Sequence, residues 1–430
     1  MRTAKRFKID NIPNFKAQLL EWSKKFNDIV WLDSNSFNQT YGQYDAILAV
    51  DALTVLSTNS TSAFEELKCY QNEINDWIFG HLNYDLKNSI EQLSSSNFDG
   101  LDFPELQMFQ PKRMIFLEAD TVIFKYHETA KHLINSDFKI IFETEIPEED
   151  NSLKNIKIQS RVSRESYLDK VNQMLNYIYR GDIYEANFCQ EFYATNTKIS
   201  PLTIYNHLNE ISKSPFASFV KNGDKYIMSA SPERYLAKRG NQIISQPIKG
   251  TAKRSVNHNE DYTLKHNLKV NSKERSENIM IVDLVRNDLS HTAIKGSVEV
   301  KELCEVYSFD QVHQMISTIS SKVEDSTHPV DIISSTFPMG SMTGAPKISA
   351  MKIIEELEET KRGVYSGAVG YFSPSNDFDF NVIIRSILYN DSNKYVSFSV
   401  GSAITSKSIP NLEYDECLIK AKAMHLALNQ

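Results

Sequence analysis

The chain has 430 residues, of which 41% are hydrophobic and 24% charged, and its formal net charge is −8. This composition is typical of a globular protein, and the acidic balance argues against a uniformly basic nucleic-acid surface. An anionic ligand would need a local cation to be held. Because the length exceeds what one core usually serves, we expect one large domain or two closely joined ones.

The first part of the chain gives mixed signals. Short apolar runs bounded by polar residues predict strands at 29–32 and 46–50. Apolar residues at helical spacing predict a helix over 64–86, and residues 114–117 with 121–124 predict a hairpin.

Residues 143–152 are acidic and polar and contain Pro147, a composition typical of a linker. We therefore divide the chain into an N-terminal region, 1–150, and a C-terminal region, 151–430.

Beyond the linker, strands gather in groups apart from helices, which predicts an α+β fold rather than a regular alternation. We expect strands at 188–192, 216–220, 226–229, 242–245, 367–372, 380–388 and 395–400. We expect helices at 163–180, 260–288 and 413–428.

The four cysteines lack the spacing of a disulfide framework or a metal-binding motif, which is typical of reduced thiols in the cytoplasm: Cys69, Cys189, Cys304 and Cys417. No apolar segment follows the basic N-terminus, as a signal peptide requires. The most apolar run, 46–56, contains Asp51 and is too short to span a bilayer. We expect a soluble cytoplasmic protein.

One lysine stands between a proline and a glycine, in Pro247-Ile248-Lys249-Gly250. Pro247 fixes its own backbone torsion and Gly250 permits a turn that other residues disfavour, so this segment can hold one amine rigidly. Read alone, the motif is more typical of a surface lysine in a turn.

Two pairs of glutamates are each three residues apart in helical sequence: Glu274 with Glu277, and Glu413 with Glu416. At this spacing both carboxylates share one helix face, and two such helices facing each other would offer four oxygen ligands suited to Mg²⁺. A single Glu-x-x-Glu pair is more typical of a solvated acidic face.

Residues 340–347 and 363–371 combine glycine, hydroxyl and lysine residues next to a helix start, which indicates anion binding. A nucleotide-binding P-loop is disfavoured because Pro346 precedes the lysine and Ile348 replaces the Ser/Thr that binds Mg²⁺.

In order and spacing, several segments resemble the chorismate-utilising enzymes, from about residue 155 to 428. The resemblance is specific because Asp283-Leu284-x-Arg286-Asn287-Asp288 occurs together with Gly344-Ala345-Pro346-Lys347 and both glutamate pairs. The N-terminal match, at 31–34 and 79–86, is weaker. The resemblance implies large, mostly antiparallel sheets with helices packed outside.

The resemblance also implies a site for chorismate and Mg²⁺. Glu277 and Glu416 match direct metal ligands, and Glu274 and Glu413 match residues that act through metal-bound water. The positions that match substrate contacts are Ser341, Tyr365, Arg385, Gly401, Lys347 and Gln314. Of these, Arg385 and Tyr365 match the residues that bind the enolpyruvyl carboxylate.

Lys249 discriminates within the family. Pro-Ile-Lys-Gly-Thr is similar to the aminodeoxychorismate synthases, whereas anthranilate synthases have a small residue at the lysine position. The resemblance implies that Lys249 attacks ring C2 and that Glu233 protonates the departing C4 hydroxyl, after which ammonia enters at C4. The expected product is 4-amino-4-deoxychorismate, for 4-aminobenzoate and folate synthesis.

Three positions depart from the family pattern. Glu185 stands where ammonia-using members usually have glutamine, and its role is open. Gln314 stands at the position of an active-site histidine, while His313 is one residue earlier and would face the other side of a strand. Ala403 replaces a common second glycine in the loop that begins at Gly401.

None of the cysteines lies in a Gly-x-Cys-x-Gly glutaminase context, so we expect ammonia from a separate glutamine amidotransferase subunit. The alternative enzyme is anthranilate synthase component I, which also releases pyruvate. A chorismate-binding regulatory protein without turnover is a third possibility.

Overall fold

The computed structural model describes residues 1–37, 40–147, 156–309 and 312–429. Its strands form one antiparallel network that branches at the long strand β5 (Leu106–Glu118). Strand β3 (Ala46–Thr58) pairs along one edge of β5, while β4 (Ile78–Leu82) and β6 (Thr121–His127) share the other edge. Strand β1 (Arg2–Lys8) continues the sheet beyond β6.

The first branch continues from β3 and ends at β8, whose first residue is Glu185. In order, its strands are β2 (Asp28–Asp33), β9 (Phe216–Asn222), β10 (Lys225–Ser231), β19 (Ser386–Asn390), β20 (Tyr395–Thr405) and β8 (Glu185–Ala194). The short strands β7 (Gln159–Ser160) and β16 (Gly344–Ala345) pair with the two ends of β8.

The second branch continues from β4 to β15. Its strands are β17 (Ala368–Phe372), β18 (Phe378–Val382), β11 (Arg234–Arg239), β12 (Gln242–Gln246), β15 (Val312–Lys322), β13 (Ile248–Lys253) and β14 (Glu299–Ser308). Strand β13 follows β12 along one edge of β15, and β14 pairs along the other edge.

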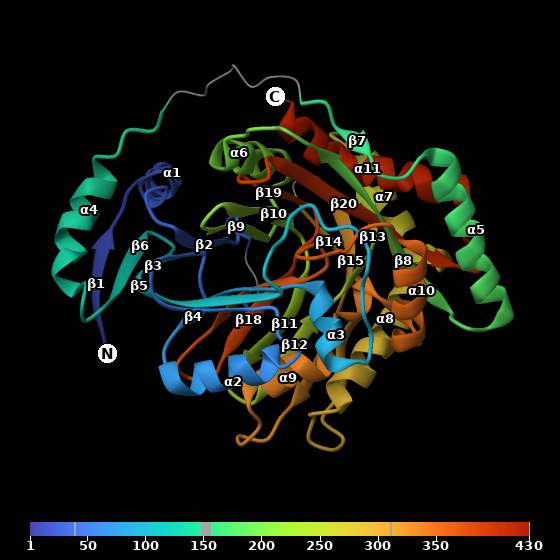
Figure 1. Ribbon diagram of the computed structural model, residues 1–430, viewed down its shortest axis with the longest axis horizontal. Helices are drawn as coiled ribbons and strands as arrows, with labels where there is room; N and C mark the ends of the chain where they lie inside the picture. The colour runs from blue at the N-terminus through green and yellow to red at the C-terminus, as the bar shows by residue number, and fades with distance from the viewer. Residues whose placement is uncertain (38–39, 148–155, 310–311, 430) are drawn as a thin grey trace.

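Two apolar cores lie on opposite sides of the first branch. Alternate residues of β2 point to opposite faces, so Val30 belongs to the core that includes Leu236 and Phe380 of the second branch, whereas Trp31 belongs to the core that includes helix residues. The helices lie around the outside of the strands (Figure 1). They are α1 (Ile12–Ser23), α2 (Ala63–Ile74), α3 (Lys87–Ile90), α4 (Ile134–Phe142), α5 (Arg164–Arg180), α6 (Pro201–Ser212), α7 (His258–Val270), α8 (Ser272–Ser290), α9 (Pro329–Thr336), α10 (Lys347–Leu357) and α11 (Pro410–Leu428).

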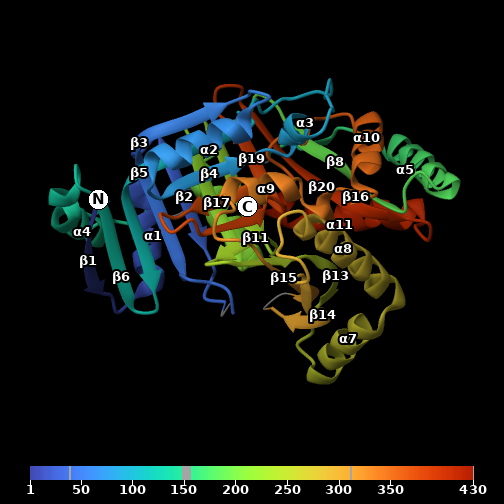
Figure 2. The same cartoon turned by 90° about the horizontal axis from the view of Figure 1, so that it is seen from below.

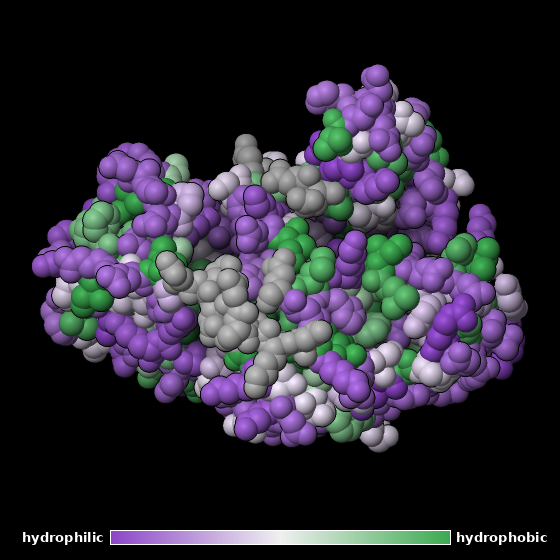
Figure 3. All heavy atoms as spheres, turned by 90° about the horizontal axis from the view of Figure 1, so that it is seen from above, coloured by the Kyte–Doolittle hydropathy of each residue, from purple (hydrophilic) through white to green (hydrophobic). Residues whose placement is uncertain are grey.

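This architecture confirms the predicted α+β class with large antiparallel sheets and helices outside. Helix α7 and strands β13 and β14 form a lobe that stands out from the body (Figure 2). Figure 3 shows hydrophilic and hydrophobic residues intermixed over the face seen from above. Each helix among the described residues is too short or too polar to cross a membrane.

Three predicted elements were wrong in extent. The helix expected over 64–86 ends at Ile74, because Asn75 adopts a left-handed conformation, and the buried strand β4 follows. The helix expected over 260–288 breaks at Asn271, whose extended backbone and side chain cap α8. The strand expected over 380–388 is interrupted by residues 383–385, and β19 starts after them.

The predicted division at residue 150 falls among residues 148–155, which lie outside the described part, and it stays a prediction. Strands from both predicted regions pair with each other: β2 with β9, and β4 with β17.

Candidate active site

Lys249 lies on an irregular part of β13. The register of β13 against β15 shifts between Ile248 and Thr251, so Lys249 and Gly250 form a bulge. Gly250 has φ +91°, a conformation that other residues rarely adopt. The Lys249 side chain is 13% exposed, and its Nζ lies 3.4 Å from Oε1 of Glu185. The proline–glycine motif therefore holds a buried amine.

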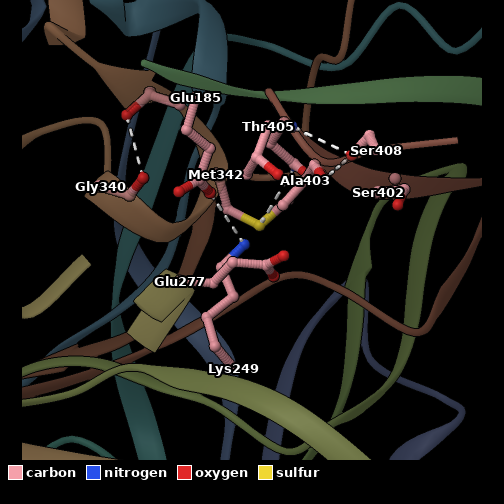
Figure 4. A network of polar contacts seen from close by, with 12 residues as sticks. Glu185, Lys249, Glu277, Gly340, Met342, Ser402, Ala403, Thr405 and Ser408 are labelled. Atoms are coloured by element: carbon pink, nitrogen blue, oxygen red, sulfur yellow. Dashed lines mark hydrogen bonds and ion pairs between the residues drawn. The ribbon is translucent and has the colours of Figure 1, made fainter. Parts of the chain in front are cut away.

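Three carboxylates surround that amine: Glu185 at the start of β8, Glu277 on α8, and Glu233 between β10 and β11. Figure 4 shows Lys249 reaching toward Glu185 and Glu277. Burial alone would lower the pKa of Lys249, but the charges of Glu185, Glu277 and Glu233 outweigh it and raise this pKa. In the unliganded site the lysine is an ammonium.

Glu233 is 5% exposed, and burial raises its pKa to about 7. A hydrogen bond from Ser341, the charge of Lys249 and the Ile248 N–H act in the opposite direction. Glu233 and Ser341 also line a cavity of about 20 Å³ with Pro247. The structure thus brings the predicted acid, the predicted nucleophile and one predicted substrate contact together.

The position of Glu185 is set by the glycine-rich segment 340–347. Ala345 of β16 pairs with Glu185, and a Cβ at Gly344 would lie 2.1 Å from the Glu185 carbonyl oxygen. Glu185 is 1% exposed on its side chain, and its Oε2 has no hydrogen-bond partner in the described part of the chain.

The two glutamate pairs lie on α8 and α11, and Lys273 links the two helices. Its Nζ is 3.7 Å from Oε1 of Glu277 and 3.5 Å from Oε1 of Glu413. Burial raises the pKa of Glu277 to about 7. Burial also acts to raise the pKa of Glu416, but Lys420, 2.7 Å away, outweighs it and lowers this pKa.

The donor chemistry of this cluster fits Mg²⁺, which prefers carboxylate oxygens. As the side chains stand, no three acidic, histidine or cysteine residues among those described are close enough together to hold a metal ion. A cation of the chain itself, Lys273, lies among the carboxylates. The predicted ligands Glu274, Glu277, Glu413 and Glu416 therefore share one cluster that binds positive charge.

Arg385 and Tyr365 lie beside this cluster. Arg385 has φ +52°, and burial lowers its pKa, while Tyr365 and Glu416 act to raise it. Its guanidinium makes no hydrogen bond to the described residues, so it is free to bind an anion. The Tyr365 hydroxyl lies 3.7 Å from Sγ of Cys189.

Gly401 joins the same wall of the site. Its carbonyl accepts a hydrogen bond of 2.8 Å from Lys420, and a Cβ at this position would lie 2.6 Å from Sγ of Cys189. A larger residue here would therefore have to displace the side chains of Cys189 and Asn187.

Lys347 and Gln314 have other surroundings. The Lys347 amine donates to Oδ2 of Asp288 at 2.7 Å and to the Thr336 carbonyl at 3.1 Å. Gln314 is buried opposite Thr251 on β13. Its neighbour His313 contacts Asp261 at 3.0 Å, which agrees with the expectation that the imidazole faces away from the Gln314 side.

Sequence reasoning missed Lys273, Lys420 and Ser402. Ser402 on β20 donates a short hydrogen bond to Oε2 of Glu413. The two lysines had a detectable signal, because Lys273 with Glu277 and Glu416 with Lys420 are i,i+4 pairs on helices. The contact of Ser402 joins a strand to a helix and has no local signal.

A larger cavity of about 70 Å³ lies near Ser34 and Asn381 and borders the first one at Arg234. Two of its acidic lining residues already form ion pairs within the protein: Asp33 with Lys16 at 2.7 Å and Asp379 with Arg234 at 3.1 Å. Lys249 and the glutamate pairs are not among its lining residues.

Comparison with known proteins identifies relatives of two enzyme types. The chain is 31% identical to aminodeoxychorismate synthase component 1 of Bacillus subtilis over 369 residues, covering 81% of the chain and 76% of that protein. It is also 31% identical to anthranilate synthase component 1 of Thermus thermophilus over 363 residues, with the same coverage of 81% and 76%.

The fold is similar to that of anthranilate synthase component I from Streptococcus pneumoniae, with a TM-score of 0.78 at 24% identity, covering 90% of this chain and 93% of that one. A sequence model of the family described as chorismate binding enzyme matches residues 27–425. The chain therefore belongs to the family of chorismate-binding enzymes.

Proposed function

We propose that the protein aminates chorismate at C4 with ammonia and forms 4-amino-4-deoxychorismate. The observation that carries the proposal is the buried amine of Lys249, held at a bulge beside Glu233. A lysine in this environment is suited to nucleophilic catalysis once it loses a proton, and a carboxyl with a pKa of about 7 is suited to acid catalysis near neutrality.

The reaction has two displacements. The Lys249 amine forms a bond to ring C2, both ring double bonds shift, and the C4 hydroxyl departs as water with the proton of Glu233. Ammonia then bonds to C4, the double bonds shift back, and the C2–N bond breaks to return the lysine amine. The ammonium formed at C4 returns one proton to the Glu233 carboxylate, so atoms and charge balance.

Substrate orientation depends on the opposite wall of the site. The free guanidinium of Arg385, beside Tyr365, suits the enolpyruvyl carboxylate. Glu277 and Glu416, with Glu274 and Glu413 through water, would hold a Mg²⁺ ion, which would supply positive charge for the ring carboxylate. Ammonia comes from a separate glutamine amidotransferase subunit, and the product leads to 4-aminobenzoate and folate.

Anthranilate synthase component I is the second candidate, because a relative of that name matches this chain at the same identity as the aminodeoxychorismate synthase. The two reactions differ in their products, since only anthranilate formation releases pyruvate.

The test supplies wild type, Lys249→Ala and Lys253→Ala with chorismate, Mg²⁺ and ammonium, and identifies products by mass. Lys253 is an exposed lysine of the same strand and serves as the control. We expect aminodeoxychorismate from wild type and Lys253→Ala, and at least a hundredfold lower rate from Lys249→Ala. Anthranilate with pyruvate would overturn the assignment, whereas full activity of Lys249→Ala would overturn only the covalent route.

A further inference from the structure

The backbone of Lys273 is fixed by a helix cap, whereas its amine makes only two long ion pairs. It is the second residue of α8, and its N–H donates to the capping side chain of Asn271 at 2.9 Å. The side chain then runs along one helical turn to Glu277 and across to Glu413 on α11. Both Nζ–oxygen distances, 3.7 Å and 3.5 Å, are longer than those of most ion pairs in this protein.

The second lysine of the cluster is held differently. Lys420 lies 2.7 Å from Glu416 and also donates to the Gly401 carbonyl at 2.8 Å, so two partners fix its amine. The Lys273 amine has no such short contact within the described residues, and its side chain is 39% exposed. Lys273 can therefore leave the cluster for solvent, whereas Lys420 is part of the wall.

All four glutamates act on Lys273 at once. Burial opposes its charge, but Glu413, Glu277, Glu416 and Glu274 together outweigh burial and raise the pKa of the lysine. The carboxylates of Glu277 on α8 and Glu413 on α11 would repel each other without a cation, so the ammonium stabilises their approach across the site.

We infer that Lys273 is a built-in counter-cation that competes with a divalent metal ion for Glu277 and Glu413. In the metal-free protein its ammonium lies between the two carboxylates and keeps the site assembled. When the metal ion binds, the side chain swings into solvent. The lysine thus weakens metal binding, and in the absence of metal it offsets the repulsion between Glu277 and Glu413. This inference rests on the metal site of the proposed function and not on the identity of the product.

The first test measures Mg²⁺ binding by calorimetry for wild type, Lys273→Met and Lys269→Met. Lys269 is a matched control, because it carries the same charge on the neighbouring helix α7 but pairs with Glu305 at 3.0 Å. We expect Lys273→Met to bind Mg²⁺ about tenfold more tightly than wild type, and Lys269→Met to stay within about twofold. Equal or weaker binding by Lys273→Met would overturn the inference.

Thermal unfolding of the same proteins gives a second readout. In EDTA, Lys273→Met is expected to melt at a lower temperature than wild type, because Glu277 and Glu413 lose the cation between them. In saturating Mg²⁺ the two melting temperatures should converge, since the metal replaces the lysine in both. A difference that persists unchanged in Mg²⁺ contradicts competition.

A third measurement uses wild type alone and stays decisive if Lys273→Met fails to fold. Acylation of Lys273 by an N-hydroxysuccinimide ester, followed by peptide mass spectrometry, should be several-fold faster with Mg²⁺ than with EDTA. An unchanged rate overturns the inference. If wild type binds no Mg²⁺ at millimolar concentration, the inference and the metal assignment both fail, while product analysis still decides the amination.

Discussion

The amine of Lys249 lies 3.4 Å from Oε1 of Glu185, and this ion pair gives a role to one of the three positions where the sequence departs from the family pattern. Because Glu185 helps to raise the pKa of Lys249, it opposes loss of the proton that a nucleophilic amine must give up. The pair therefore keeps the lysine charged in the unliganded site.

Replacing Glu185 with Gln should shift the pH dependence of amination. Activity that needs neutral Lys249 rises as pH passes through the lysine pKa, and removal of the carboxylate lowers that pKa. The rising limb of kcat/KM against pH should thus move to lower pH in Glu185→Gln. Asp182→Asn, which alters an exposed pair with Arg180, is the control and should leave the profile in place. A limb that stays fixed or moves upward contradicts this assignment.

Glu233 should make stability depend on pH. Its pKa is about 7 in the folded protein against 4.5 for the unperturbed group, so its protonated form stabilises the fold. That contribution is complete below about pH 4.5 and is lost as pH rises through about 7, at most roughly 3 kcal/mol. Glu233→Gln, which cannot ionise, should therefore gain in free energy of unfolding relative to wild type between pH 5 and 8.

Urea denaturation of both proteins in EDTA across that range measures the effect. Glu277 also has a pKa of about 7, but both proteins contain it, so the difference between them isolates Glu233. A difference that is independent of pH would show that Glu233 does not titrate in this window.

Gly250 should tolerate alanine poorly for two reasons. Its φ of +91° is strained for alanine, and the new Cβ would lie 3.1 Å from Oε2 of Glu274 and 3.2 Å from Leu268. Gly240→Ala is the matched control, because Gly240 also has positive φ but meets no atom within 4 Å. We expect Gly250→Ala to lose about 1 kcal/mol more stability than Gly240→Ala, and to lose amination activity that Gly240→Ala keeps. Equal losses in the two variants would show that backbone strain alone matters.

Ser402→Ala should weaken Mg²⁺ binding. The hydroxyl donates to Oε2 of Glu413, which is 2% exposed, and its removal leaves that carboxylate less well oriented. Removing partners that orient metal ligands typically costs tenfold or more in affinity, so we expect about that loss by calorimetry. Ser399→Ala on the same strand is the control. Unchanged affinity would place Glu413 outside the metal site.

The sequence predicted the parts of the site that depend on local pattern. Spacing alone places Glu274 with Glu277 on one helix face, and Pro247 with Gly250 marks a rigid turn around Lys249. The α+β class follows from grouped strands and helices.

Long-range contacts could not be predicted in this way. Helical spacing continued through Asn271 and past Asn75, where single backbone conformations end the helices. The sequence around Lys347 indicated an anion-binding lysine, but in the structure its amine pairs with Asp288. The environment of Glu185 depends on residues more than 60 positions away, which no local pattern encodes.

The glycine-rich segment, whose sequence indicates anion binding, also fixes the start of a strand. Gly344 lies against the backbone of Glu185, so a side chain at 344 would push the start of β8 away. Displacement of β8 would move the Glu185 carboxylate away from the Lys249 amine, although residue 344 interacts with neither charged group. The pKa of Lys249 thus depends on the size of residue 344, which carries no ionisable group.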